Sequence, residues 1–98
     1  MTEEQTAALL SSLKVDLGIS ATAFDERLGQ YLSSAEAAIR AEGATTLDPG
    51  TAQDAQLIVM YAAWTWRRRD SMEGMPRMLR YALNNRIFGE KARAGTDG

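Results

Sequence analysis

Apolar side chains recur along this chain at steps of three and four residues, the spacing of helices that each bury one face. Four such segments follow one another, and none shows the alternation of apolar and polar residues that is typical of a β-strand. The pattern predicts an all-α fold of one domain, residues 1–89, with helices at about 3–17, 22–42, 52–69 and 76–88. We expect residues 90–98 to form a flexible, disordered tail, because they are polar and contain glycine.

Residues that favour the ends of helices set these limits. Thr2 and Gln5 have the spacing of a capping box, and Thr22 can cap the second helix with its hydroxyl group. Pro76 fits the first turn of the fourth helix, and Gly89 is expected to end that helix. The sequence thus predicts the helix boundaries from local chemistry alone.

The third helix is apolar on two opposite faces. One face carries Ala55, Ile58, Val59, Ala62 and Trp66, and the other carries Leu57, Met60, Tyr61 and Trp64. A helix that is apolar all round is expected at the centre of a bundle, in contact with other helices on both sides. Alternatively, the face with Tyr61 and Trp64 meets another subunit, because aromatic side chains are enriched in protein interfaces.

A chain of 98 residues has little interior in which to bury so much apolar helix surface. A domain of this size buries roughly 60–70% of the surface of its unfolded chain, so an isolated subunit is only modestly stable. We therefore expect a subunit that completes its burial against other copies of itself or against a partner.

Positive charge is concentrated in the second half of the chain. Residues 1–49 contain three basic and eight acidic side chains, whereas residues 50–98 contain eight basic and five acidic ones. Either the basic residues form a solvated face, or they meet the acidic half of another copy or an acidic partner.

Two groups of polar residues in the second half are candidates for binding. The arginines at residues 67–69 follow the third helix, where cations suit the negative end of the helix dipole. On the fourth helix, Arg77, Arg80 and Asn84 lie within roughly 60° of one another, because a helix has about 3.6 residues per turn. This stripe can reach phosphate groups or acidic side chains.

Arg86 differs from these arginines because it falls among the apolar positions Leu79, Ala82 and Leu83 of the fourth helix. A lone buried guanidinium is costly, since it loses its hydration without gaining a partner. Either Arg86 extends its charged end outward to solvent, or it pairs with a carboxylate across a subunit interface.

The residue types that carry out most catalysis and metal binding are missing from the sequence. It contains no cysteine and no histidine, which removes disulfides, thiolate metal sites and the commonest general base. No glycine-rich phosphate loop, nucleophile elbow or calcium-binding loop is present. We therefore predict no catalytic residues, no cofactor, no metal ion and no enzymatic activity.

The sequence also shows no membrane or targeting segment. The longest apolar run, residues 57–64, is far shorter than a membrane span, and the N-terminus has no basic segment followed by an apolar run. We expect a soluble intracellular protein with no membrane partner.

A helix-turn-helix module is one functional alternative. The third and fourth helices with a glycine-containing turn match it loosely, and Arg77, Arg80 and Asn84 are residue types that read base edges. The turn is long for that motif and contains Pro76, and the isoelectric point of about 5.0 is low for a sequence-specific DNA-binding protein. A DNA-binding or regulatory module is thus the second hypothesis, and a small helical protein-binding module is the third.

Several segments, taken in order, resemble the head–tail connector proteins (adaptors, or head completion proteins) of tailed bacteriophages and prophages. They are the opening helix, the amphipathic second helix, the LDPG turn at 47–50, the aromatic helix LIVMYAAW at 57–64 and the segment GMPRMLRYALNNR at 74–86. The resemblance covers about residues 2–88. It depends on the order and spacing of these segments, since none of them is a chemical signature alone.

This resemblance implies a small α-helical subunit that assembles into a ring, commonly twelvefold, beneath the portal protein after DNA packaging. Such a ring extends the DNA channel and provides a docking surface for stopper or tail-completion proteins. The implied partners are further copies of the chain, the portal protein and the stopper or tail protein, with non-specific contact to packaged DNA. The implied location is the virion, with assembly in the host cytoplasm.

The residues expected to act in such an assembly fall into three groups. The subunit or partner interface is expected to include Tyr61, Trp64, Arg67, Arg68, Arg69 and Arg86. The stripe expected to face the DNA channel or an acidic partner consists of Arg77, Arg80 and Asn84. By position in the family, the arm that contacts the portal is expected to include Glu90, Lys91 and Arg93, and to become ordered only on docking.

Overall fold

The computed structural model describes the backbone of residues 1–97 and the side chains of residues 1–93. Over this part of the chain the structure is helical and contains no strand, which confirms the predicted all-α fold. Its elements are α1 (Glu3–Leu17), α2 (Asp25–Glu42), α3 (Ala52–Arg67), the short 3₁₀-helix η1 (Arg68–Asp70) and α4 (Arg77–Asp97).

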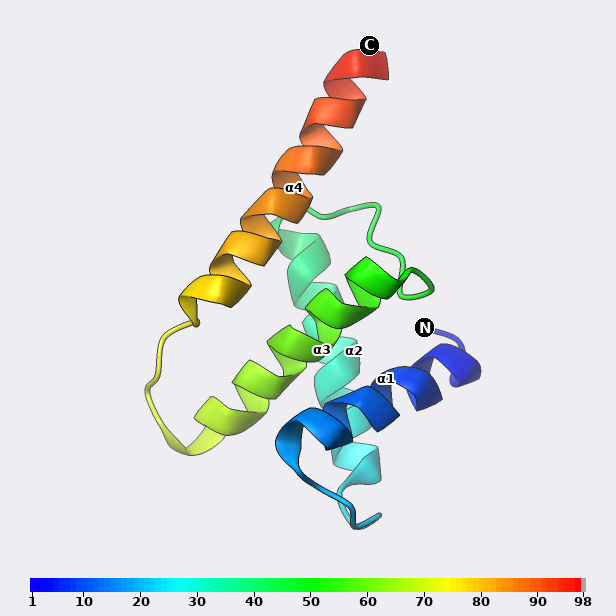
Figure 1. Ribbon diagram of the computed structural model, residues 1–98, viewed down its shortest axis with the longest axis vertical. Helices are drawn as coiled ribbons and strands as arrows, with labels where there is room; N and C mark the ends of the chain where they lie inside the picture. Colours follow the sequence, from blue (N-terminus) through cyan, green and yellow to red (C-terminus); the bar gives the residue numbers. More distant parts are fainter. Residues whose placement is uncertain (98) are drawn as a thin grey trace.

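Helix α3 lies at the centre of the molecule and contacts α1, α2 and α4 (Figure 1). Helices α1 and α2 also pack against each other, so that α1, α2 and α3 form a three-helix body. Helix α4 lies on the other side of α3, and its C-terminal part extends beyond the body (Figure 1). The central position that the two apolar faces of the third helix predict is therefore confirmed.

The core is made of aliphatic side chains from all four helices. The largest completely buried ones are Leu13, Leu28, Leu32, Ile39, Ile58, Leu79 and Leu83. Each of these stabilises the fold by roughly 1.5–3 kcal/mol relative to an exposed position. Two of them, Leu79 and Leu83, lie one turn apart on α4 and fix the face that this helix turns toward α3.

The N-termini of the first two helices are formed differently. Thr2 and Gln5 form the predicted capping box, with the two reciprocal hydrogen bonds at 3.0 Å each. Helix α2 begins three residues later than predicted, and Thr22 does not cap it with its hydroxyl group. Instead, the carbonyl group of Thr22 accepts a hydrogen bond from Asp25 N at 3.1 Å, which closes a turn ahead of the helix.

The predicted end of the fourth helix is wrong. Helix α4 passes through Gly89 and continues to Asp97, so Glu90, Lys91 and Arg93 belong to the helix and not to a disordered tail. Gly89 does not adopt the positive φ that would end a helix, and the side chain of Glu90 is anchored to the loop before α3. The rest of the predicted tail, residues 94–98, lies outside the residues whose side chains the structure describes.

Candidate functional site

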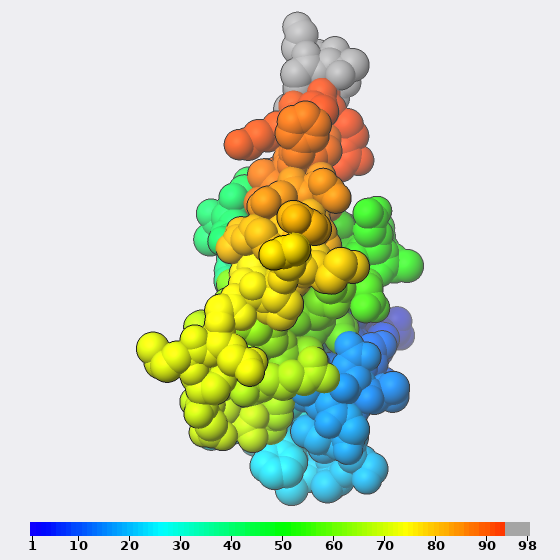
Figure 2. Space-filling view, turned by 60° about the vertical axis from the view of Figure 1, so that its left-hand side comes forward, coloured from blue at the N-terminus to red at the C-terminus, as the bar shows by residue number. Residues whose placement is uncertain are grey.

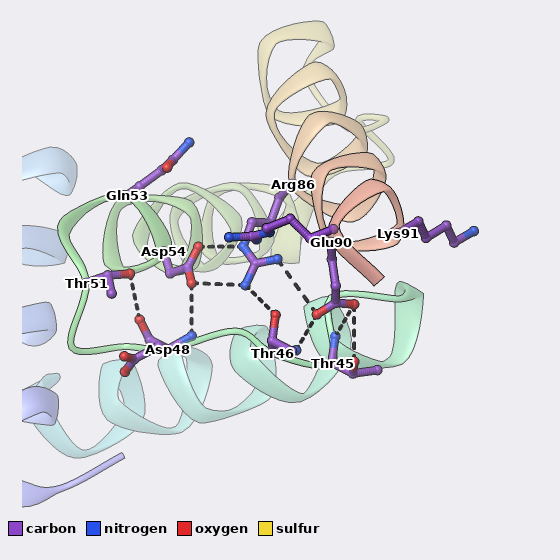
Figure 3. A pocket seen from close by; sticks show the side chains of 10 residues that line it. Thr45, Thr46, Asp48, Thr51, Gln53, Asp54, Arg86, Glu90 and Lys91 are labelled. Carbon is purple, nitrogen blue, oxygen red and sulfur yellow. Dashed lines mark hydrogen bonds and ion pairs between the residues drawn. The ribbon is translucent and has the colours of Figure 1, made fainter. Parts of the chain in front are cut away.

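A cluster of polar side chains joins α4 to the loop between α2 and α3 (Figure 3). We call it the clasp, and it consists of Thr45, Thr46, Asp54, Arg86 and Glu90. The two threonines lie in the loop, Asp54 lies in the first turn of α3, and Arg86 and Glu90 lie one turn apart on α4. The clasp therefore connects α4 to a loop and a helix that lie more than 30 residues earlier in the sequence.

The centre of the clasp is a buried ion pair between Arg86 and Asp54. Arg86 Nε donates to Asp54 Oδ1 at 2.8 Å and Arg86 Nη2 donates to Asp54 Oδ2 at 3.3 Å, so the guanidinium group binds the carboxylate with two hydrogen bonds. The side chains are only 10% and 9% exposed. Arg86 Nη2 also donates to Thr46 Oγ1 at 3.1 Å, and the backbone N–H of Asp48 donates to Asp54 Oδ2 at 3.0 Å.

These contacts keep both members of the pair charged. Burial raises the pKa of Asp54, but the hydrogen bonds from Arg86 and Asp48, together with the positive charge of Arg86, outweigh that effect and lower the pKa below its ordinary value. The hydrogen bond to Asp54 raises the pKa of Arg86. A buried pair of this kind aligns two elements, because separating it would leave two poorly hydrated charges.

Glu90 forms the outer part of the clasp. Its carboxylate accepts hydrogen bonds from the backbone N–H groups of Thr45 and Thr46 and from Thr45 Oγ1. Hydrogen bonding by Thr46, its side chain first, and then by Thr45 lowers the pKa of Glu90 from 4.5 to about 2. Glu90 Oε1 also lies 3.8 Å from Arg86 Nη1, an atom that is buried and donates no hydrogen bond. The charge of Glu90 thus compensates the part of the guanidinium group that Asp54 does not reach.

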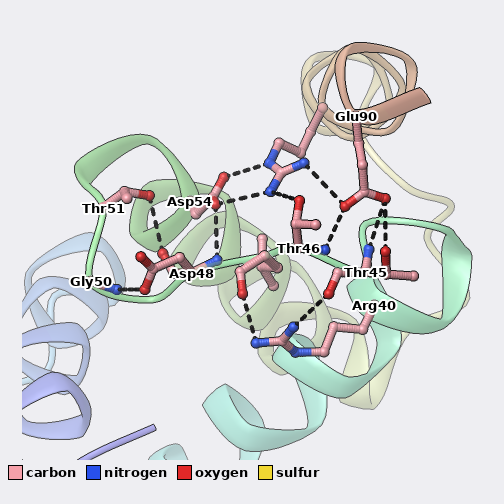
Figure 4. A network of polar contacts seen from close by, with 10 residues as sticks. Arg40, Thr45, Thr46, Asp48, Gly50, Thr51, Asp54 and Glu90 are labelled. Carbon is pink, nitrogen blue, oxygen red and sulfur yellow. Dashed lines mark hydrogen bonds and ion pairs between the residues drawn. The ribbon is translucent and has the colours of Figure 1, made fainter. Parts of the chain in front are cut away.

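The loop that carries the threonines is held from α2 as well (Figure 4). Arg40 donates to the carbonyl oxygens of Thr45 and Leu47 at 3.1 and 2.7 Å. At the end of α2, Gly43 has a φ of 132°, and a Cβ atom there would lie 3.1 Å from Cγ2 of Ile87. Position 43 therefore requires glycine, because the chain turns there with a positive φ and because Ile87 of α4 packs closely against it.

An open groove of about 750 Å³ lies beside the clasp. Gln53, Lys91 and Arg93 line it together with the clasp residues, so positive and negative side chains are mixed along its walls. Lys91 points away from the ion pair (Figure 3). Among the side chains that the structure describes, no three acidic residues form a group that could hold a metal ion.

The clasp corrects the prediction for Arg86. This residue neither extends into solvent nor leaves its charge to be paired by another subunit, because Asp54 of the same chain binds it. The prediction of a free portal-contacting arm is also wrong for Glu90, which is fixed in the clasp. Sequence reasoning missed Asp54, because an acid in the first turn of a helix is expected to favour the helix dipole and to remain exposed.

The three arginines at residues 67–69, which lie at the end of α3 and in η1, contact different parts of the molecule. Arg67 Nη2 donates to the carbonyl oxygen of Asp16 at 2.8 Å, at the end of α1. The guanidinium group of Arg68 lies 4.4 Å from the ring centre of Trp64, and that of Arg69 lies 4.0 Å from the ring centre of Trp66. All three arginines are exposed. Each therefore stabilises a different part of the end of α3, mainly through cation–π and carbonyl contacts.

Tyr61 and Trp64 lie partly buried on α3, with their rings edge to face at a centroid distance of 5.4 Å. Trp64 Nε1 donates to the carbonyl oxygen of Gly74 at 3.2 Å, which ties the segment before α4 to α3. Burial, followed by the negative charge of Glu42, raises the pKa of Tyr61. Within one subunit, the aromatic rings of this face contact each other and the segment before α4. The face therefore has a role in the fold of the subunit, whether or not it also meets another subunit.

Arg77, Arg80 and Asn84 lie along one flank of α4. Arg77 and Asn84 are exposed, and Arg80 Nη1 lies 3.7 Å from Glu42 Oε1 of α2. Lys91 and Arg93 are exposed further along the same helix. The structure therefore places the predicted stripe at the surface, as the sequence pattern predicts.

Large apolar side chains are also exposed on α4. Met78, Tyr81 and Phe88 are 74%, 57% and 74% exposed. Figure 2 shows this side of the molecule, where α4 up to residue 93 lies at the surface. On α1, at the other side of the body, Val15 is 79% exposed. Contiguous exposed apolar residues often mark a binding surface, whereas a single one such as Val15 is common in monomeric proteins.

No protein-family model matches the chain, and none of the curated proteins or solved structures matches it either. In the described part of the chain, no helix is both long enough and apolar enough to cross a membrane.

Proposed function

We propose that this chain is a structural subunit of a phage head–tail connector and has no enzymatic activity. Copies of it form a ring beneath the portal protein, extend the DNA channel and provide a docking surface for stopper or tail-completion proteins. The protein then acts in the virion and assembles in the host cytoplasm. The proposal originates from the resemblance of several sequence segments, in their order along the chain, to head–tail connector proteins. The exposed apolar side chains of α4 are the structural observation that supports it.

The shape of the subunit suits this role. The molecule measures 48 × 32 × 18 Å, with apolar residues exposed on α1 and on α4 at different sides of α3. A closed ring requires two different, complementary surfaces on each subunit, held in a constant relative orientation. The clasp would keep the relative orientation of the two surfaces constant, because it fixes α4 to the loop that joins α2 and α3.

The charge of α4 is compatible with contact to packaged DNA. Arg77, Lys91 and Arg93 are exposed and contribute positive charge that binds phosphate groups without reading sequence. The net charge of the chain is −2, so we expect only weak, salt-dependent binding of free DNA.

The mass of the assembled protein tests the proposal. Light scattering after size exclusion should show about twelve copies of the chain in one assembly. This assembly should form either from the chain alone at high concentration or when the chain is mixed with the portal protein encoded in the same genome. A portal protein from an unrelated phage is the control and should not promote assembly. A chain that remains monomeric or dimeric in the presence of its own portal protein would contradict the proposal.

A DNA-binding module is the second candidate, favoured by the exposed positions of Arg77 and Asn84 on α4. It predicts a sequence-specific shift of duplex DNA in a gel, which is lost on Arg77→Ala and on Arg80→Ala. The connector proposal predicts instead that any shift is weak, independent of sequence and abolished by moderate salt.

A further inference from the structure

The exposed apolar residues of α4 and the polar Asn85 lie on one stripe of the helix. Met78, Tyr81, Asn85 and Phe88 follow one another at steps of three, four and three residues, and all four are exposed. At 100° per residue, this stripe lies roughly opposite the face that carries Leu79, Leu83 and the clasp arginine. We call it the outer face of α4. Because the inner face is already packed on α3, the outer face is free to bind something else.

The charges beside this stripe indicate the character of its partner. Between residues 77 and 93, α4 contains five basic side chains and one acidic one. The acidic one, Glu90, and the basic Arg86 are both used in the clasp. The remaining charges at the surface of this segment are positive, so a surface that packs here should be acidic at its edges.

Helix α1 presents such a surface. Glu4, Ala8, Ser11 and Val15 follow one another at steps of four, three and four residues, and all four are exposed. We call this line of residues the outer face of α1. Its neighbours at the surface include the acidic side chains Glu3 and Asp16. The outer face of α1 therefore has small residues and one exposed valine, with acidic side chains beside it, whereas the outer face of α4 has large residues with basic side chains beside it.

We propose that the outer face of α4 in one copy packs against the outer face of α1 in the next copy. The two faces lie on different sides of α3 (Figure 1), so the contact joins unlike surfaces and leaves one of each free for the next subunit. Contact of two α4 helices would instead bring positive flanks together, which disfavours a two-fold dimer through this face. This inference rests on the proposed function, because it identifies the contact that builds the ring.

Single cysteines provide a direct test, because the natural chain contains none. Ser11→Cys places a thiol on the outer face of α1 and Asn85→Cys places one on the outer face of α4. The two variants are purified separately, one with a small tag, mixed, and treated with a short bismaleimide under conditions in which light scattering shows assembly. We expect the mixed pair to give a strong cross-linked dimer, and each variant alone to give at most one tenth of it.

Ser33→Cys, on the exposed side of α2, is the matched control and should not cross-link to Asn85→Cys. Phe88→Ser supplies an independent readout. Because Phe88 is exposed, this variant should keep the helical circular dichroism of the natural chain while it raises the concentration needed for assembly at least tenfold.

The outcomes separate this inference from the proposed function. Cross-linking of Asn85→Cys to itself would show a two-fold contact and would overturn the α1–α4 pairing. Rings of the expected mass without a cross-link between residues 11 and 85 would overturn the pairing but leave the connector function intact. Failure of the chain to assemble on its own portal protein would overturn both.

Discussion

The three-helix body and helix α4 are stabilised in different ways. In the body, α1, α2 and α3 contact one another, and the packing is dominated by aliphatic side chains such as Leu13, Leu32 and Ile58. Helix α4 packs chiefly on α3 through Leu79 and Leu83, and it also carries the nearly buried Arg86, which pairs with Asp54 and Glu90. The difference indicates that burial builds the body, whereas specific polar contacts determine where α4 lies.

The largest expected effect comes from a cavity in the body. Leu32→Ala should lower the free energy of unfolding by about 2–5 kcal/mol, because Leu32 is completely buried and the surroundings of such a cavity relax only in part. Denaturant unfolding followed by circular dichroism measures the change. Val15→Ala is the control, and because Val15 is exposed it should change the free energy of unfolding by less than about 0.5 kcal/mol. Equal effects of the two substitutions would contradict the assignment of the core.

Breaking the clasp should affect α4 more than the body. Asp54→Asn leaves the buried guanidinium group of Arg86 without its charged partner, which should cost about 2–3 kcal/mol. Hydrogen exchange should show faster exchange along α4 than in the wild type, with α1 and α2 much less affected. Asp48→Asn removes the same charge from an exposed side chain in the neighbouring loop and should leave the exchange of α4 nearly unchanged. Uniform acceleration in all helices would argue against a separate role for the clasp.

Acid should release α4 before it unfolds the body. The pKa of Glu90 is lowered from 4.5 to about 2 by its hydrogen bonds, so the stability that Glu90 contributes is fully present above pH 4.5 and is lost as the pH falls toward 2. The lowered pKa of Asp54 acts in the same direction below its ordinary value of 3.8. A pH titration of α4 exchange should show this loss, and Glu90→Gln should reduce it. If the protection of α4, meaning its exchange rate relative to the intrinsic rate at each pH, stayed constant between pH 4.5 and 2, the role of these carboxylates would be contradicted.

The smallest effect is expected at an ion pair on the surface of the body. Lys14 Nζ lies 2.7 Å from Asp25 Oδ1, but both side chains remain partly exposed to water. Asp25→Asn should therefore lower the free energy of unfolding by no more than about 1 kcal/mol, and less at high salt. Chemical denaturation at two salt concentrations measures this. If Asp25→Asn lowered the free energy of unfolding as much as Asp54→Asn does, burial would not determine how much an ion pair contributes to the stability of this protein.

The helices and their buried faces could be predicted from the sequence because they depend on residues close together in the chain. The two-faced pattern of residues 52–69 led to the central position of α3, and Thr2 with Gln5 led to the capping box. Local signals failed where distant contacts act against them. Gly89 is a good residue to end a helix, but α4 continues because Glu90 is bound to Thr45 and Thr46, more than 40 residues earlier.

The candidate site was predictable only in part, for the same reason. The exposed positions of Arg77 and Asn84 follow from helical periodicity, as does the unusual placement of Arg86 among apolar residues. The partner of Arg86 does not follow from any local pattern, because Asp54 lies 32 residues away and is brought near only when α4 packs on α3.

The sequence by itself determined the helical class, the approximate limits of three helices and the concentration of basic residues in the second half, since each depends on composition or short-range spacing. Only the tertiary structure decided which charges are paired and which remain at the surface. It placed Asp54, Arg86 and Glu90 in one clasp and left the outer face of α4 uncovered. The physical reason is that an ion pair depends on the distance between side chains in space, which the packing of the helices sets.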